Sequence, residues 1–131
     1  MLFVNLPVAD VAATRAFFTA IGFRFDALFC DAGTLCMDVD GAKVMFHQRR
    51  RFAGYAARPE QEIDGAREAV VAVSASSRRE VDERADLAAA NGAGVLRGPE
   101  DLGFMYCRSF CDLDDHAWEI VWMNPAEIPQ S

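Results

Sequence analysis

Apolar and polar positions in the first 48 residues follow the pattern of a strand, a helix and three further strands. Asp10 precedes the amphipathic stretch, where its side chain can cap a helix, and Gly22 follows the stretch as a typical helix end. Asp40-Gly41 is a strong signal for a tight turn between two strands. The expected elements are a strand at 2–8, a helix at 11–21, and strands at 23–30, 34–39 and 42–47.

The same order of elements returns in the second half of the chain. Ser77 and Glu80 form a capping-box signature at the start of a second amphipathic stretch. Asn91-Gly92 ends that stretch, and shorter apolar segments follow it. The expected elements are a strand at 69–74, a helix at 78–91, and strands at 94–97, 104–111 and 117–123.

Corresponding positions of the two halves are separated by a nearly constant number of residues. Ser77 follows Asp10 by 67 residues, and Gly92 follows Gly22 by 70, which indicates an internal repeat. We therefore expect an α+β fold of two βαβββ units, whose paired mixed four-stranded sheets form a half-open barrel with a helix on each outer face. The expected single domain spans 1–131, with unit one at 1–48, a linker or flap at 49–67, unit two at 68–124 and a polar tail at 125–131.

Composition and charge fit one globular domain and exclude some functions. The 131 residues are 52% hydrophobic and 25% charged, which is ordinary for a globular protein. The net charge of −7 argues against nucleic acid as a partner, because phosphate binding needs a basic surface. The run Arg49-Arg50-Arg51 is a local exception, either a solvated loop or an anion-holding lip over a pocket.

Two absences bear on location. No apolar run reaches the roughly 18 residues that a membrane helix needs. The N-terminus enters a strand without a basic and apolar leader, so we expect a cytoplasmic protein with no membrane partner.

The four cysteines have no paired metal-binding spacing, and we expect them to be reduced core residues: Cys30, Cys36, Cys107 and Cys111.

Four segments carry a resemblance to a known superfamily. They are FVNLPVAD at 3–10, FF at 17–18, IGF at 21–23 and FCDLDDHAWE at 110–119. With this layout the chain resembles the vicinal oxygen chelate superfamily, which includes glyoxalase I, fosfomycin-resistance proteins, extradiol dioxygenases and bleomycin-resistance proteins. The resemblance covers almost the whole chain. It identifies the superfamily and not the reaction.

The resemblance implies where a divalent metal would bind. Enzymes of this superfamily hold the metal with His or Glu on the first and last strand of each unit, at positions that hold Phe3, Met45, Val70 and Glu119 here. The repeat supports this mapping, because Val70 follows Phe3 by 67 residues and Glu119 follows Met45 by 74. Only Glu119 can ligate, whereas a catalytic site usually needs about three protein ligands. We therefore expect no catalytic metal and no other cofactor.

Strand alternation adds two polar residues to this region. Asn5 lies on the face of Phe3, and His47 on the face of Met45. Asn5, His47 and Glu119 can form a group of polar side chains that binds no metal. As an alternative, the three side chains form a displaced metal site. A third interpretation is that His47 is a core histidine without a chemical role.

Glu119 itself is either a ligand anchor, a candidate catalytic base, or a structural carboxylate held by Asn5 or Arg108. The expected ligand pocket consists of Asn5, His47, Tyr106, Arg108, Trp118, Glu119 and Trp122.

Three functions follow from the resemblance. The first is a small-molecule-binding protein without a catalytic metal, similar to bleomycin-resistance proteins, which are acidic homodimers that sequester a cationic ligand. The second is a glyoxalase-like, metal-dependent lyase or isomerase with Glu119 as base. The third is a non-enzymatic structural or regulatory partner protein. In the first two cases the partners are a small molecule and a second copy of the chain.

Overall fold

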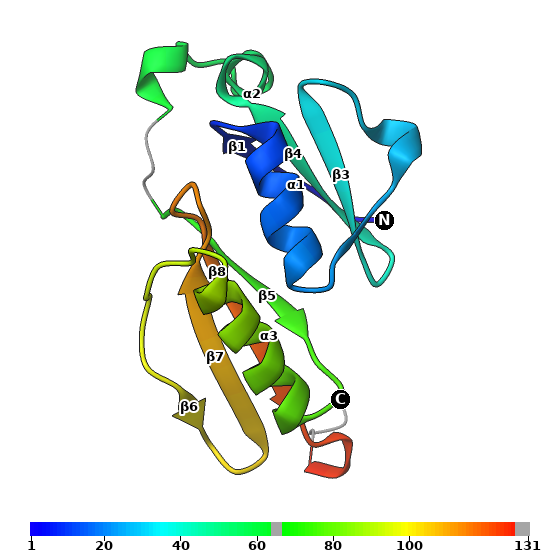
Figure 1. Cartoon of the computed structure of the whole chain (residues 1–131), viewed down its shortest axis with the longest axis vertical. Helices are drawn as coiled ribbons and strands as arrows, with labels where there is room; N and C mark the ends of the chain where they lie inside the picture. The colour runs from blue at the N-terminus through cyan, green and yellow to red at the C-terminus, as the bar shows by residue number, and fades with distance from the viewer. Residues whose placement is uncertain (64–66, 128–131) are drawn as a thin grey trace. The chain divides into compact units, whose positions relative to one another are not determined.

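Two mixed four-stranded sheets organise the chain, each in its own unit. The computed structural model describes residues 1–63 and 67–127. The chain divides into two compact units, Met1–Ala66 and Arg67–Ser131, and each is described by itself (Figure 1). The predicted α+β class with two mixed four-stranded sheets is confirmed. None of the helices in the described residues is long and apolar enough to cross a membrane.

The first unit contains a sheet of order β1-β4-β3-β2, in which β1 runs parallel to β4 and the other pairs are antiparallel. Its elements are β1 (Phe3–Val8), α1 (Val11–Ala20), β2 (Arg24–Phe25), the 3₁₀ turn η1 (Ala27–Phe29), β3 (Thr34–Val39), β4 (Ala42–Gln48), α2 (Arg49–Ala56) and the 3₁₀ turn η2 (Glu60–Glu62).

Local signals explain the start of this unit. The Asp10 carboxylate accepts a hydrogen bond from the Ala13 amide at 3.0 Å and caps α1, as predicted. Asp40 and Gly41 both have positive φ angles, 46° and 89°, so they form the expected tight turn between β3 and β4. The strand predicted at 23–30 was too long. Asp26 caps η1 instead, and only Arg24–Phe25 pairs with β3.

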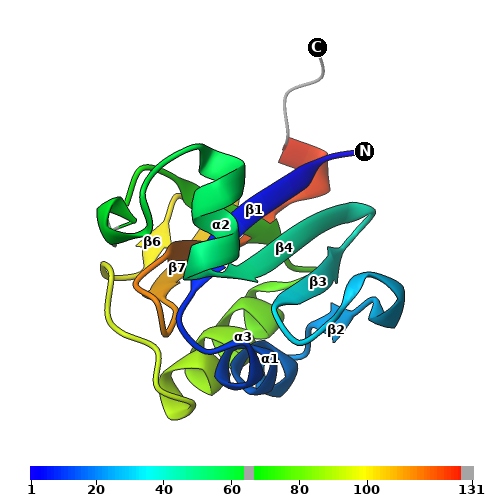
Figure 2. The ribbon, with the colours of Figure 1, turned by 90° about the horizontal axis from the view of Figure 1, so that it is seen from above.

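The side chains of β4 separate the two faces of the first sheet. Phe46 stacks on Phe18 of α1 with ring centroids 5.0 Å apart, so this face is the helix-covered one. Its neighbour His47 therefore points to the opposite face, because successive strand residues alternate. There His47 meets Tyr55 of α2, with ring centroids 4.9 Å apart. Figure 2 shows α1 and α2 on opposite sides of this sheet.

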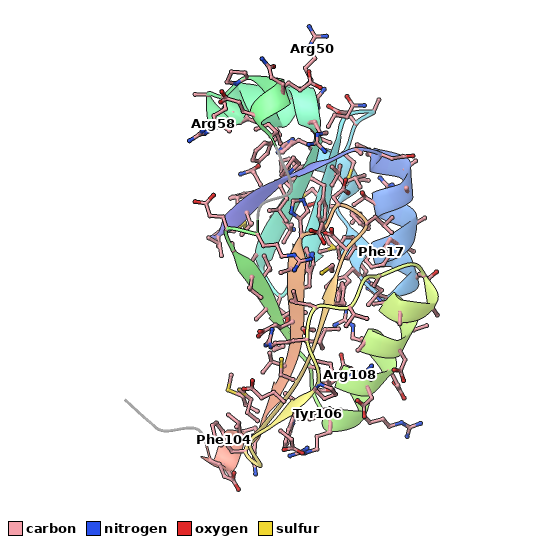
Figure 3. All side chains as sticks on the ribbon, turned by 90° about the vertical axis from the view of Figure 1, so that its left-hand side faces the viewer. Phe17, Arg50, Arg58, Phe104, Tyr106 and Arg108 are labelled. Carbon is pink, nitrogen blue, oxygen red and sulfur yellow. The ribbon has the colours of Figure 1, made fainter. Side chains whose placement is uncertain are left out.

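Helix α2 occupies part of the segment that we expected to be a linker or flap. Two arginines of the Arg49–Arg51 run anchor it: Arg49 donates to the carbonyl of Ile63, and Arg51 forms an ion pair with Asp31 at 2.9 Å. Arg50 points away from the unit (Figure 3). The run is thus the first turn of a helix and not a solvated loop. Residues 64–66 of the expected linker lie outside the described residues.

The second unit repeats the topology of the first, with order β5-β8-β7-β6 and β5 parallel to β8. Ser77 caps its helix by accepting from the Glu80 amide at 3.0 Å, as predicted, while the Glu80 carboxylate accepts from the amide of Ser76. The elements are β5 (Val70–Ser74), α3 (Arg78–Ala90), β6 (Glu100–Asp101), β7 (Met105–Cys111), β8 (Ala117–Met123) and the 3₁₀ turn η3 (Pro125–Glu127).

Two further expectations in this unit are corrected or limited. The strand predicted at 94–97 is wrong: only Gly94 makes a β-bridge, with Cys111, and the short strand comes later as β6. The reason is that the Ser109 hydroxyl, and not a neighbouring strand, bonds both the amide and the carbonyl of Arg97. The polar tail begins with η3, and its residues 128–131 lie outside the described part.

The acidic turn of the superfamily-like segment is built around one carboxylate. Asp112 accepts hydrogen bonds from the amides of Asp114 at 2.9 Å and His116 at 3.0 Å through Oδ1. Its Oδ2 accepts from the indole N–H of Trp118 at 2.9 Å. Trp118 is fully buried, and Asp112 is nearly so. These residues therefore connect β7 to β8 and stabilise the core of the second unit.

All four cysteines are free. Three are buried, and Cys30 is half-buried.

Candidate functional site

Each sheet has a face covered by its long helix and a second face turned away from it. In the second sheet, Tyr106 and Arg108 lie on the face covered by α3 (Figure 3). The Tyr106 hydroxyl donates to Asp82 at 2.7 Å, and Arg108 donates to Asp82 and Asp86 at 3.2 and 2.8 Å. Arg108 is thus held by α3 and not by Glu119.

The second predicted pocket tryptophan is also on this face. Arg78, in the first turn of α3, lies over the rings of Tyr106 and Trp122 at 5.2 and 5.0 Å. Its guanidinium also donates to both oxygens of Asp101 at 2.8 and 2.9 Å. These bonds lower the pKa of Asp101 to about 2. The two aromatic rings therefore hold a structural arginine, and Trp118 lies in the core of the same face.

Glu119 points to the other face of the second sheet, the one away from α3. It is the neighbour of Trp118 on β8, so its side chain alternates to the opposite side. Arg97 donates to Glu119 Oε1 and forms an ion pair with it. The side chains of Arg97 and Glu119 are 42% and 22% exposed, so the pair is accessible to solvent. The structure thus identifies Arg97 as the partner of Glu119, in place of Asn5 or Arg108.

The neighbours of this ion pair set its charge. The hydrogen bond that Arg97 donates to Glu119 raises the pKa of Arg97, so the guanidinium stays protonated. Burial and the charge of Glu119 raise the pKa of the Cys107 thiol to about 11. Cys107 is therefore a neutral thiol and not a nucleophile at ordinary pH. Ser109, directly across from Glu119 on β7, fixes the backbone of Arg97.

In the first unit, His47 belongs to a directed chain of hydrogen bonds. Arg51 Nη1 donates to Thr34 Oγ1 at 2.6 Å, and Thr34 Oγ1 lies 2.9 Å from His47 Nδ1. His47 Nε2 lies 2.8 Å from Asn5 Oδ1. An arginine can only donate, so the Thr34 hydroxyl is free to give its own proton to Nδ1. Nδ1 is then an acceptor, and Nε2 carries the proton that is donated to Asn5.

This chain keeps the His47 ring neutral. Burial lowers the pKa of His47, and the nearby charge of Arg51 lowers it further. A second proton on Nδ1 would face a hydroxyl that already accepts from Arg51. His47 therefore orients Asn5 on the face of the first sheet away from α1.

The residues at the four positions that the resemblance assigns to a metal do not fit a divalent ion. Three of these positions offer no side-chain oxygen or nitrogen to a metal, because they hold Phe3, Met45 and Val70. Phe3 and Val70 are 51% and 52% exposed. Glu119 is paired with a guanidinium, and both ring nitrogens of His47 are engaged. In the part of the chain that the structure describes, no three His, Cys, Asp or Glu side chains are grouped to hold a metal ion.

The seven predicted pocket residues thus fall into three groups. Glu119 lies on the face of the second sheet away from α3, and Asn5 and His47 lie together on the first sheet. The other four lie on the α3 side of the second sheet: Tyr106, Arg108, Trp118 and Trp122.

Sequence reasoning missed four residues that organise these sites. Thr34 and Arg51 complete the chain to His47, Arg78 fills the aromatic face, and Arg97 binds Glu119. The Arg49–Arg51 run was a weak signal for Arg51. Period-two alternation along β8 was a usable signal that separates Trp118 and Trp122 from Glu119. Nothing in the local sequence pairs Arg97 with a residue on β8.

Known proteins share this fold. The family described as "Bleomycin resistance protein-like N-terminal" matches residues 1–39. No curated protein matches the sequence.

Solved structures cover far more of the chain. A hypothetical protein from S. aureus aligns with a TM-score of 0.80 at 20% identity, over 93% of this chain and 91% of the other. A glyoxalase/bleomycin resistance protein/dioxygenase family enzyme from Burkholderia phytofirmans aligns with a TM-score of 0.80 at 16% identity, over 92% and 96%. A glyoxalase-related enzyme from Fulvimarina pelagi aligns with a TM-score of 0.78 at 16% identity, over 93% and 86%.

These likenesses define the class of fold. The chain has the fold of the glyoxalase, bleomycin-resistance and dioxygenase proteins, and the resemblance to the vicinal oxygen chelate superfamily is confirmed at this level. At these sequence identities the comparisons show the fold only, and the reaction has to be inferred from the residues of the site.

Proposed function

We propose that this protein binds a small organic molecule on the face of the second sheet away from α3 and does so without a catalytic metal. The observation that carries this proposal is Glu119. It is the one inherited metal position with a ligating side chain, yet it forms an ion pair with Arg97 on a solvent-accessible sheet face. A carboxylate held in this way suits a ligand anchor more than a metal ligand.

A glyoxalase-like lyase or isomerase with Glu119 as general base is the second candidate. A lactoylglutathione lyase from Agrobacterium tumefaciens has a similar structure, with a TM-score of 0.68 at 16% identity, over 93% of this chain and 92% of the other. For this function Glu119 would have to exchange Arg97 for a substrate proton. The pair is partly exposed, so such an exchange requires no opening of the core.

A charge-deleting substitution tests the role of Glu119. Metal-free bleomycin is the first probe, because the matching family model carries that name. Glu119→Gln should weaken binding by roughly 1.5–3 kcal/mol, the scale of a charge-assisted hydrogen bond, in a calorimetric titration. Glu83→Gln is the matched control, because Glu83 also accepts from an arginine, Arg79, on the exposed side of α3. Equal affinities of Glu119→Gln and the unmodified protein would remove Glu119 from the binding site.

Metal analysis separates the two candidates. After dialysis without chelator, the purified protein should contain no stoichiometric Zn, Ni, Mn or Fe, because the side chains of Phe3, Met45 and Val70 offer no oxygen or nitrogen ligand. About one ion per chain, together with metal-dependent turnover of a hemithioacetal of glutathione to S-lactoylglutathione, would favour the lyase.

We also propose that the protein is a homodimer. The support is the exposed apolar surface of its sheet edges, which includes Phe3 on β1 and Val70 on β5. Buried apolar surface is the usual driving force of association between copies of a chain. Light scattering should then give twice the chain mass of 14.4 kDa. A monomer at low micromolar concentration would contradict this proposal.

A further inference from the structure

We propose that Arg97 and Glu119 together bind a neutral molecule that presents an acceptor oxygen next to an N–H or O–H donor, with a primary carboxamide as the simplest case. This inference rests on the proposed function and names the class of ligand. Arg97 would donate to the ligand oxygen, and Glu119 would accept from the ligand donor.

Arg97 is held in place by its backbone. Three residues before it, Gly94 exchanges two hydrogen bonds with Cys111, at 2.9 and 3.0 Å. Three residues after it, Glu100 pairs with Cys107 in the sheet. Between these points Ser109 bonds the amide and the carbonyl of Arg97 at 3.3 and 3.2 Å. The segment therefore runs beside β7, and the Arg97 side chain crosses it to reach β8.

The guanidinium has donors to spare. Arg97 Nη2 makes the bond to Glu119 and a long contact of 3.9 Å to the Cys107 sulfur. A guanidinium carries five N–H groups in a fixed plane, so one nitrogen engaged in this way leaves others for a ligand. The 42% exposure of the Arg97 side chain makes them accessible.

The charges on this face favour a neutral ligand. Arg97 stays protonated, so it repels a metal ion or an organic cation that approaches Glu119 from its side. An anion that approaches Arg97 meets Glu119 and also Glu100, whose charge acts on Arg97 as well. Cys107 is a neutral thiol, with its pKa raised to about 11. A paired donor and acceptor of no net charge satisfies both members of the ion pair.

The face that carries the pair also exposes apolar side chains. Ala72 on β5 lies directly beside Glu119 in the sheet, and it is small and exposed. Met123 lies on the same face and is also exposed, at 44%. An aromatic or aliphatic group attached to the carboxamide can therefore cover apolar surface next to the polar pair.

Three probes with one ring and different charge test this inference. Benzamide, benzoate and benzylammonium are titrated into the ¹⁵N-labelled full chain, and the Arg97 Nε–H and the amides of Ser109 and Glu119 are followed by NMR. Benzamide should shift these resonances at the lowest concentration. Arg97→Met should weaken benzamide binding by roughly tenfold, because it removes a charged donor. Arg97→Lys should also weaken it, because it keeps the charge and loses the planar fork.

Arg79→Met is the matched control. It removes an arginine from another Arg–Glu pair of the same unit, Arg79–Glu83, and should leave benzamide binding unchanged. Tryptophan fluorescence checks that each variant is folded. If Arg97→Met does not fold, the Arg97→Lys result decides.

Three outcomes would overturn the inference. If benzoate binds most tightly, Arg97 is an anion site. If benzylammonium binds most tightly and Arg97→Met leaves its affinity unchanged, Glu119 alone anchors the ligand. No shift with any probe up to its solubility limit would show that the pair is a surface ion pair only. None of these would by itself defeat metal-free ligand binding, which fails instead on the stoichiometric metal analysis.

Discussion

Asp112→Ala should be among the most destabilising single substitutions in the second unit. The Asp112 carboxylate accepts three hydrogen bonds, two from the turn amides of Asp114 and His116 and one from the indole of Trp118. The two amides lie at a turn, where water can replace the carboxylate in part. The indole N–H of the fully buried Trp118 would lose its bond to Asp112 Oδ2.

The expected loss can be estimated bond by bond. The loss of a hydrogen bond to a charged group costs about 1.5–3 kcal/mol, so the bond from the Trp118 indole accounts for about 2 kcal/mol. The two turn amides resemble a helix N-cap, whose loss costs about 1 kcal/mol. Asp112→Ala should therefore lower the free energy of unfolding by about 3 kcal/mol. Asp112→Asn keeps an oxygen for the turn amides and should lose only the indole bond, about 2 kcal/mol.

Urea unfolding followed by tryptophan fluorescence measures these losses in the right place, because both tryptophans, Trp118 and Trp122, lie in the second unit. Asp86→Ala is the control: Asp86 is 70% exposed and forms an ion pair with Arg108, so its loss should cost less than about 1 kcal/mol. An Asp112→Ala variant as stable as the Asp86→Ala control would refute the argument. The acidic turn would then have a role other than folding.

Three further predictions concern protons and thiols. Arg78 lowers the pKa of the Asp101 carboxyl from 3.8 to about 2, so this group should stabilise the fold fully above pH 3.8 and lose its contribution as the pH falls towards 2. In Asp101→Asn, the urea concentration at the unfolding midpoint should therefore fall less steeply between pH 3.8 and 2 than in the unmodified protein. Burial lowers the pKa of His47, so the stability of the fold should fall as the pH drops below 6.5. In the neutral ring, ¹⁵N NMR should find the proton on Nε2, and a proton on Nδ1 would contradict the hydrogen-bond chain. At about pH 8, half-buried Cys30 should react with a disulfide reagent faster than Cys107, whose pKa is about 11. Equal reaction rates in the folded protein would contradict the burial and the raised pKa of Cys107.

Local signals were sufficient for most of the secondary structure. Asp10, Ser77 and the Asp40-Gly41 turn act through residues within four positions of themselves, so their effects can be derived without the fold. The errors arose where a local pattern competed with a distant partner. Residues 94–97 have the apolar content of a strand, but a hydroxyl from β7 takes the backbone bonds of Arg97.

The candidate site divides in the same way. The repeat and the two-residue period of a strand predict that Asn5, His47 and Glu119 lie on corresponding faces of their sheets. Which group each of them meets depends on side chains that are far apart in sequence: Glu119 and Arg97 are separated by 22 residues, and His47 and Asn5 by 42.

The sequence by itself therefore determined the repeated unit and its caps and turns, because each of these follows from residue type and short-range spacing. Only the tertiary structure decided that Arg97 holds Glu119, that Arg78 occupies the aromatic face and that Trp118 belongs to the core. An ion pair or a stacked ring requires contact within a few ångströms, and such contact exists only after β7, β8 and α3 have packed together.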